Sequence, residues 1–125
     1  GCTVRPMVNQ VLAHITNTPD AVLEFCRAEG ILCEAYSPIA HGEALKNPAI
    51  ASMAAKYGVT PAQLCIRYVL ELGMVALPKT ANPAHMRANA AVDFEIAPED
   101  MQTLAQLPHI ADYGAFTAFP VFSGK

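Results

Sequence analysis

A lysine and a threonine stand between a short apolar segment and the start of a helix. Residues 74–77 read as a strand, Lys79 and Thr80 follow, and Asn82 and Pro83 occupy the N-cap and first helical positions. A helix N-terminus presents free backbone N–H groups and the positive end of the helix dipole, and a lysine adds a full charge. This pattern is typical of a phosphate site. A capped helix with a solvated lysine is the alternative reading of the same residues.

Two other apolar segments also carry polar side chains near their ends. The first holds Gln10, and the second ends on Tyr36, which Ser37 follows. In parallel α/β proteins the C-terminal ends of the strands share one rim, where the chemistry gathers. Gln10 could pair with another amide, Tyr36 could stack on a planar ring, and Lys79 could hold a phosphate. That set suits a dinucleotide with an amide-bearing ring, whereas local backbone bonding by Gln10 and core packing by Tyr36 are the alternatives.

Strands alternate with helices along the chain. The expected strands are 7–11, 31–36 and 74–77, and the expected helices begin at Thr18-Pro19, Asn47-Pro48, Thr60-Pro61, Asn82-Pro83 and Pro98, the last running to about residue 107. Apolar strands that alternate with helices indicate parallel strands joined by crossover helices. Three such strands leave two unpaired edges, which soluble proteins normally avoid. We therefore expect an α/β chain, 1–125, that is a single partial domain of a larger structure, with 108–125 as an irregular apolar tail.

Composition bounds the class of protein. The chain has 125 residues, of which 53% are hydrophobic and 15% charged, and this is apolar for so small a soluble protein. No apolar stretch approaches the ~18 residues of a membrane span, and the net charge of −3 argues against a nucleic-acid partner. The cysteines lack zinc-site spacing, and we expect Cys26, Cys33 and Cys65 to be buried thiols in a reducing cytoplasm. The opening Gly1-Cys2 carries no hydrophobic signal segment and suggests a boundary within a longer chain.

Several short motifs of this sequence occur together in one known family. They are, in order, Val8-Asn9-Gln10-Val11, Gly30-Ile31, Ala35-Tyr36-Ser37-Pro38, Ala62-Gln63, Leu77-Pro78-Lys79-Thr80, Asn89 and Asp93-Phe94-Glu95. Their order and spacing resemble the C-terminal part of the aldo-keto reductase family, across nearly all of the chain. Members are (β/α)8 barrels that use NADPH to reduce carbonyl groups. The resemblance implies a partial (β/α)8 barrel made of about its last three βα units.

The resemblance also implies a role for particular side chains in binding NADPH. Gln10 corresponds to the residue that binds the nicotinamide carboxamide, and Tyr36 to the residue that stacks on the nicotinamide ring. Ser37 and Ile39, with the loop through Gly42, resemble the segment that runs along the pyrophosphate. We expect these five residues to form one half of the cofactor site.

The other half of the expected site binds the adenosine end. Lys79 and Thr80 resemble the pair that grips the 2′-phosphate, with Asn82 at the start of the following helix, and Asn89 resembles the residue near the adenine. His85 occupies the place where an arginine often helps to hold the phosphate. NADPH is therefore the expected cofactor, although this departure weakens the expected preference over NADH.

The family's catalytic centre is absent from this sequence. By resemblance it needs a tyrosine as proton donor beside a lysine, an aspartate and a histidine, all from the first four strands. None of Tyr36, Tyr57, Tyr68 and Tyr113 lies in that motif. We expect no catalytic residue, no metal site and no turnover by this chain alone. The complete enzyme would reduce an aldehyde or ketone, and the aromatic tail hints at an apolar one.

Two other hypotheses fit the same sequence. The unpaired strand edges and the high apolar content would also suit a non-catalytic half-barrel module that self-associates or docks on another chain. A gene remnant that keeps the family's sequence without its function is the third. In the leading hypothesis the missing N-terminal half of the barrel, or self-association, covers the strand edges.

Overall fold

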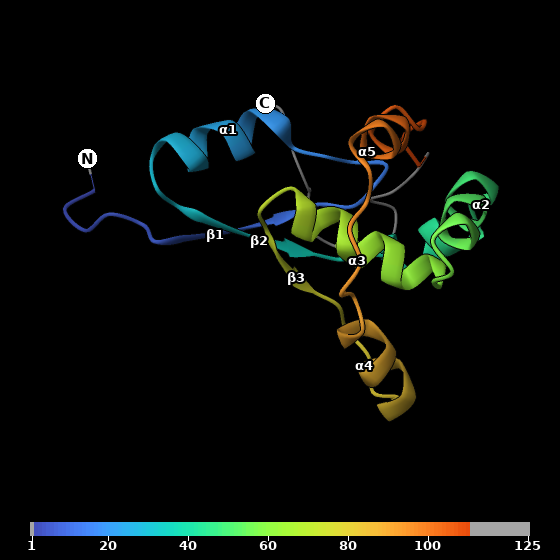
Figure 1. Cartoon of the computed structure of the whole chain (residues 1–125). Coiled ribbons are helices and arrows are strands. Elements are labelled where there is room, and N and C mark those ends of the chain that lie inside the picture. The colour runs from blue at the N-terminus through green and yellow to red at the C-terminus, as the bar shows by residue number, and fades with distance from the viewer. Residues whose placement is uncertain (1, 111–125) are drawn as a thin grey trace.

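Three parallel strands and their connecting helices make up residues 2–110, the part of the chain that this computed structural model describes (Figure 1). In chain order the elements are β1 (Val8–Leu12), α1 (Asp20–Ala28), β2 (Leu32–Tyr36), η1 (Ala40–Lys46), α2 (Pro48–Lys56), α3 (Pro61–Glu71), β3 (Val75–Leu77), α4 (Pro83–Ala90) and α5 (Pro98–Ala105). The sheet has the order β1-β2-β3, and both pairings are parallel. The predicted parallel α/β arrangement is confirmed.

The three strands end level with one another. Leu12, Tyr36 and Leu77 are the last residues of their strands, and they are register partners across the sheet. Gln10 lies two residues before the end of β1, and Lys79 lies two residues after the end of β3. Tyr36 and Lys79 therefore lie at the C-terminal rim of the sheet, and Gln10 lies two residues inside it.

The two faces of the sheet differ in how well they are covered. Cys33 and Ala35 of β2 are buried, as part of a core that includes Ile50 of α2 and Leu64 of α3. Side chains alternate between faces along a strand, and register partners share a face. The opposite face carries Val8, Gln10, Leu12, Leu32, Glu34, Tyr36, Val75 and Leu77. Leu12 is buried at the end of β1, but most of these side chains are exposed, and we call this the uncovered face.

Three of the helices begin with the caps that the sequence predicts. Asn47 and Asn82 each accept a hydrogen bond from the backbone N–H two residues on, at 2.9 and 2.8 Å. Thr60 forms a capping box with Gln63, in which each side chain bonds the other's backbone N–H. Each cap is a contact between near neighbours in sequence, which explains why the pattern located these helices.

The predicted start of the first helix is wrong. We expected Thr18 as the N-cap and Pro19 as the first helical residue, but Pro19 is the N-cap and the helix begins at Asp20. The Thr18 hydroxyl instead lies 3.0 Å from the hydroxyl of Tyr68 on α3. Thr18 therefore makes a tertiary hydrogen bond with Tyr68 and does not cap α1.

Other boundaries differ from the prediction by one or two residues, and one element was missed. β1 spans Val8–Leu12 instead of 7–11, β2 begins at Leu32 instead of Ile31, and α5 ends at Ala105. The segment η1, made of short helical turns interrupted by non-helical backbone at His41 and Gly42, occupies a stretch that we expected to be a loop. Of the predicted tail, the part from 111 on, with Tyr113, Phe116, Phe119 and Phe122, lies outside the described residues.

A carboxylate joins α5 to α2. Lys56 donates a hydrogen bond to Asp100 Oδ2 at 2.6 Å, and the Tyr57 hydroxyl donates to the same oxygen. The backbone N–H of Ala97 donates to the Tyr57 oxygen at 2.9 Å. The hydrogen bonds from Lys56 and Tyr57 hold the pKa of Asp100 below its usual value. Tyr57 therefore has a structural role in this chain.

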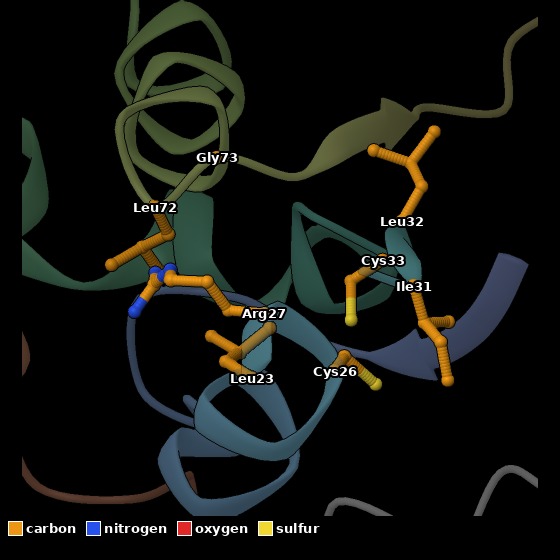
Figure 2. Close-up of a pocket in the computed structure, with 8 residues that line it drawn as sticks. All are labelled: Leu23, Cys26, Arg27, Ile31, Leu32, Cys33, Leu72 and Gly73. Atoms are coloured by element: carbon orange, nitrogen blue, oxygen red, sulfur yellow. The ribbon is translucent and has the colours of Figure 1, made fainter. Parts of the chain in front are cut away.

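Two buried thiols, Cys26 and Cys33, lie near the end of the sheet opposite the polar rim. Cys26, Cys33 and Cys65 are buried and free, as predicted. Figure 2 shows the first two beside a cavity of about 110 Å³ between α1, the start of β2 and the end of α3. Burial, with a hydrogen bond to Cys26, raises the pKa of Cys33 to about 11. A thiol in this state is protonated at neutral pH and reacts slowly.

Residues 2–110 contain neither a membrane-spanning helix nor a metal-binding cluster. None of their helices has the length and apolar character needed to cross a membrane. They also contain no group of three or more His, Cys, Asp or Glu side chains arranged to hold a metal ion.

Candidate functional site

A groove runs along the polar rim between the end of β2 and the end of β3. Its first part has a volume of about 310 Å³ and is lined by Ser37, Pro38, Ile39, His41, Gly42, Leu77 and Lys79. Its second part has a volume of about 240 Å³ and is lined by Ile39, Leu45, Thr60, Ala62, Lys79, Thr80, His85, Ala88 and Asn89. Ile39 and Lys79 line both parts, so the two adjoin each other, and together we call them the rim groove.

The rim groove contains most of the residues that the sequence analysis selected. They are Ser37, Ile39, Gly42, Lys79, Thr80, His85 and Asn89. Gln10, Tyr36 and Asn82 are not among its lining residues: the first two lie on the uncovered face and the third caps α4. Sequence reasoning did not assign Leu45, Thr60 or Ala62 to the site, although all three line the groove. Thr60 was expected only as a helix start and Ala62 only as part of a family motif, and Leu45 carried no motif.

The loop after β2 has an unusual backbone. Ser37, Ala40 and His41 have φ angles of 52°, 49° and 53°, in the left-handed region that residues other than glycine rarely adopt. The backbone N–H of Ala40 donates to the Ser37 carbonyl at 2.8 Å, and that of Gly42 donates to the Ile39 carbonyl at 2.9 Å. The loop thus folds back on itself at the strand end and forms one wall of the rim groove.

Lys79 is the described lysine whose charge has no partner within residues 2–110. Lys46 pairs with Glu43 and Lys56 pairs with Asp100, at 2.7 and 2.6 Å, whereas none of the ion pairs or hydrogen bonds of the described residues involves the Lys79 ammonium. Because Lys79 lines both parts of the rim groove, this unpaired positive charge lies at the middle of it. An anion is the chemical partner that such a position suits.

Helix α4 borders the second part of the groove, beyond the end of β3 (Figure 1). Asn82 uses its side-chain oxygen to cap the helix, and its own N–H donates to the Thr80 hydroxyl oxygen at 3.1 Å. His85 and Asn89 are four residues apart and therefore share one helix face, which lines the groove. The site therefore offers a cation, a hydroxyl, an imidazole and a carboxamide along one wall.

Gln10 and Tyr36 lie on the uncovered face, close to the rim. Gln10 is exposed, and its Nε2 donates a hydrogen bond to Glu34 Oε2 at 3.2 Å. Tyr36 is half-buried at the end of β2, and burial raises its pKa. Glu34 was not among the site residues that the sequence predicted. The strand's period of two, which places Glu34 on the same face as Tyr36, was the signal that could have shown its importance.

His14 is a buried imidazole just beyond β1. Its exposed fraction is 1%, and its Nδ1 lies 3.0 Å from the Thr16 hydroxyl oxygen. Desolvation by burial, with smaller contributions from the charges of His109 and His41, lowers the pKa of His14 to about 4. The folded protein therefore favours neutral His14, whereas the unfolded chain binds a proton at this residue near pH 6.5.

We expect the free energy of unfolding to decrease as the pH is lowered, because the folded protein holds His14 neutral. The contribution of neutral His14 to stability is complete above about pH 6.5 and is lost as the pH falls toward about 4. At pH 5 the loss from this residue should be about 2 kcal/mol. Urea unfolding at pH 7 and pH 5 measures it, with His14→Gln as the control that cannot titrate. Equal pH dependence in the two proteins would show that the folded state does not hold this imidazole neutral.

The fold and the rim groove together define a class of protein. Parallel strands with crossover helices, and a polar groove at the C-terminal ends of the strands, are the features of α/β proteins that bind ligands at that edge of the sheet. The family model described as "Aldo/keto reductase family" matches residues 3–108. The chain belongs to the aldo-keto reductase family.

Individual relatives show how much of a family member this chain represents. An uncharacterized oxidoreductase of Schizosaccharomyces pombe is 40% identical over 105 residues, which are 83% of this chain and 38% of that protein. An aldehyde reductase of Saccharomyces cerevisiae is 38% identical over 109 residues, which are 86% of this chain and 35% of that protein. The chain thus spans under two fifths of the length of these relatives.

Solved structures give the same picture of the fold. A mutant of Gox0644, crystallised in complex with NADPH, is 30% identical and superimposes with a TM-score of 0.81, covering 93% of this chain and 45% of its own. Because the structural relatives are aldo-keto reductase barrels and the chain matches only part of each, its three βα units are part of a (β/α)8 barrel. The predicted partial barrel is confirmed.

Proposed function

We propose that this chain is the C-terminal part of an NADPH-dependent oxidoreductase that reduces aldehydes or ketones to alcohols by hydride transfer. The observation that carries the proposal is the rim groove, with the unpaired charge of Lys79 at its middle. The aldehyde reductase among the relatives and the structure of Gox0644 with NADPH support it. Cytoplasmic location belongs to the same proposal, because buried free thiols suit a reducing compartment.

The residues of the groove fit an extended dinucleotide. The Lys79 ammonium and the Thr80 hydroxyl would hold the 2′-phosphate, with His85 in support and Asn89 near the adenine. Asn82 would act indirectly, because its side chain caps α4 and so fixes the turn that follows Thr80. A single unpaired cation beside a hydroxyl is the donor set that a phosphate group requires.

The other end of the dinucleotide would lie toward the uncovered face. Ser37 and Ile39, with the folded-back loop through Gly42, would run along the pyrophosphate. Tyr36 would stack on the nicotinamide ring, and Gln10 would bind its carboxamide. Both side chains lie on the uncovered face, which would be the interior of the complete barrel, where a carbonyl substrate would approach.

NADPH, when bound, supplies the hydride for carbonyl reduction, and a general acid must supply the proton. The described tyrosines do not suit that task. Tyr57 is bonded to Asp100 and to the Ala97 N–H, Tyr68 is buried beside Thr18, and Tyr36 has the stacking role. We therefore assign the proton donor to strands of the barrel outside this chain.

The uncovered face favours a second candidate function. Its apolar side chains would suit a half-barrel that self-associates or docks on another chain without catalysis. In the leading proposal the remaining strands of the complete protein that contains this chain, here called the complete enzyme, cover that face. In the first candidate the uncovered face is the interior of a complete barrel, and in the second it is an interface with another chain.

Turnover and binding distinguish these candidates. We expect the complete enzyme to oxidise NADPH in the presence of an aldehyde or ketone from a panel of apolar carbonyls, and the 125-residue chain alone to show no turnover. The loss of absorbance at 340 nm measures both. Turnover by the chain alone would contradict the assignment of the proton donor to other strands. Failure of the complete enzyme to bind NADPH would contradict the proposed function and favour the docking module.

A further inference from the structure

A glutamine and a glutamate face each other on the uncovered face of the sheet. Gln10 of β1 and Glu34 of β2 are direct register partners, and Gln10 Nε2 donates to Glu34 Oε2 at 3.2 Å. The apolar side chains of Val8, Leu32 and Val75 surround the pair on that face. Among the described residues of the face, Glu34 is the only carboxylate, and Gln10 is the side chain that it bonds.

The chemistry of the two groups makes this contact directional. An amide has a donor end and an acceptor end of almost the same shape, so an isolated glutamine can present either one. An ionised carboxylate only accepts hydrogen bonds, so it selects the NH2 end of Gln10. The carbonyl oxygen of Gln10, the acceptor, is then the end that is left for another partner.

We propose that Glu34 is a positioning residue that orients the Gln10 amide for the nicotinamide carboxamide of the cofactor. With its NH2 end held by Glu34, Gln10 presents Oε1 to accept a hydrogen bond from the NH2 of that carboxamide. The inference rests on the proposed function, and it adds a residue that itself does not touch the cofactor. When further strands cover the face, the lower dielectric strengthens the Gln10–Glu34 bond and makes the orientation more exclusive.

The shape-matched variant Glu34→Gln tests the inference. Gln at position 34 can bond either end of Gln10, so the orientation is no longer selected while side-chain volume is kept. We expect the dissociation constant of NADP+ for the complete enzyme to rise about tenfold, which is the effect of losing about one well-oriented hydrogen bond. The affinity for adenosine 2′,5′-bisphosphate, which lacks the nicotinamide, should change by less than about twofold. Isothermal titration measures both ligands.

A double-mutant cycle separates positioning from a general structural effect. In the Gln10→Ala background, Glu34→Gln should have no further effect on NADP+ binding, because the side chain that it orients is gone. Glu24→Gln, an exposed residue of α1 that removes the same charge, should leave both affinities unchanged. Unchanged NADP+ binding in Glu34→Gln, or the same loss with and without Gln10, would overturn the inference. Failure of the wild type to bind adenosine 2′,5′-bisphosphate would overturn the proposed function, and with it this inference.

Discussion

Replacing Lys79 by Met should weaken NADPH binding to the complete enzyme about 100-fold and leave NADH binding within about twofold. The two cofactors differ only in the 2′-phosphate, and Lys79 is the unpaired cation of the rim groove. A hydrogen bond to a charged group contributes about 1.5–3 kcal/mol, and 100-fold corresponds to about 2.7 kcal/mol. Because Lys79 has no described partner, its removal leaves no other charge unpaired, so the fold should be unaffected. The ratio of the two dissociation constants, from quenching of protein fluorescence, is the measurement.

Lys46 provides the matched control for this prediction. It lies on η1, is exposed, and pairs with Glu43 outside the lining of the rim groove. Lys46→Met removes the same charge from the same side of the molecule and should leave the ratio unchanged. A Lys79→Met enzyme that distinguishes NADPH from NADH as well as the wild type would show that the 2′-phosphate is held elsewhere.

The elements that sequence reasoning located correctly are those whose causes are local. Asn47, Thr60 and Asn82 cap their helices through bonds to backbone groups two or three residues away, and the printed sequence contains everything that such a bond requires. Thr18 has the same chemistry but bonds Tyr68, fifty residues away in sequence. The residues next to Thr18 contain no sign of its contact with Tyr68, and for this reason the predicted start of α1 is wrong.

The same distinction divides the candidate site. Lys79 and Thr80 could be selected because a strand end, a proline and an N-cap stand within five residues of them. The contact of Gln10 with Glu34 depends on the register between two strands that α1 separates. Register is a tertiary property, fixed here by which face of each strand the core buries. The sequence could therefore supply the members of the site but not the bond that orients one of them.

Placing two lysines on the uncovered face should have opposite effects on the chain and on the complete enzyme. Leu32 and Val75 expose 46% and 38% of their surface in the described structure, and we expect the isolated chain to associate through them. Leu32→Lys with Val75→Lys should make the isolated chain monomeric, because charged side chains favour water over an apolar contact. In the complete enzyme the same lysines would be buried without partners, at several kcal/mol each, and together this is a large share of the roughly 5–15 kcal/mol by which most domains are stable.

Light scattering of the isolated chain and thermal unfolding of the complete enzyme measure the two effects. Phe25 is the control, because it is 61% exposed and apolar but lies on α1, away from the uncovered face. Phe25→Lys should change neither the association of the chain nor the folding of the enzyme. A wild-type chain that is a stable 13.3 kDa monomer with cooperative unfolding would contradict the prediction. That result would mean that the uncovered face is stable in contact with water, so its exposed apolar side chains would not by themselves drive association with further strands.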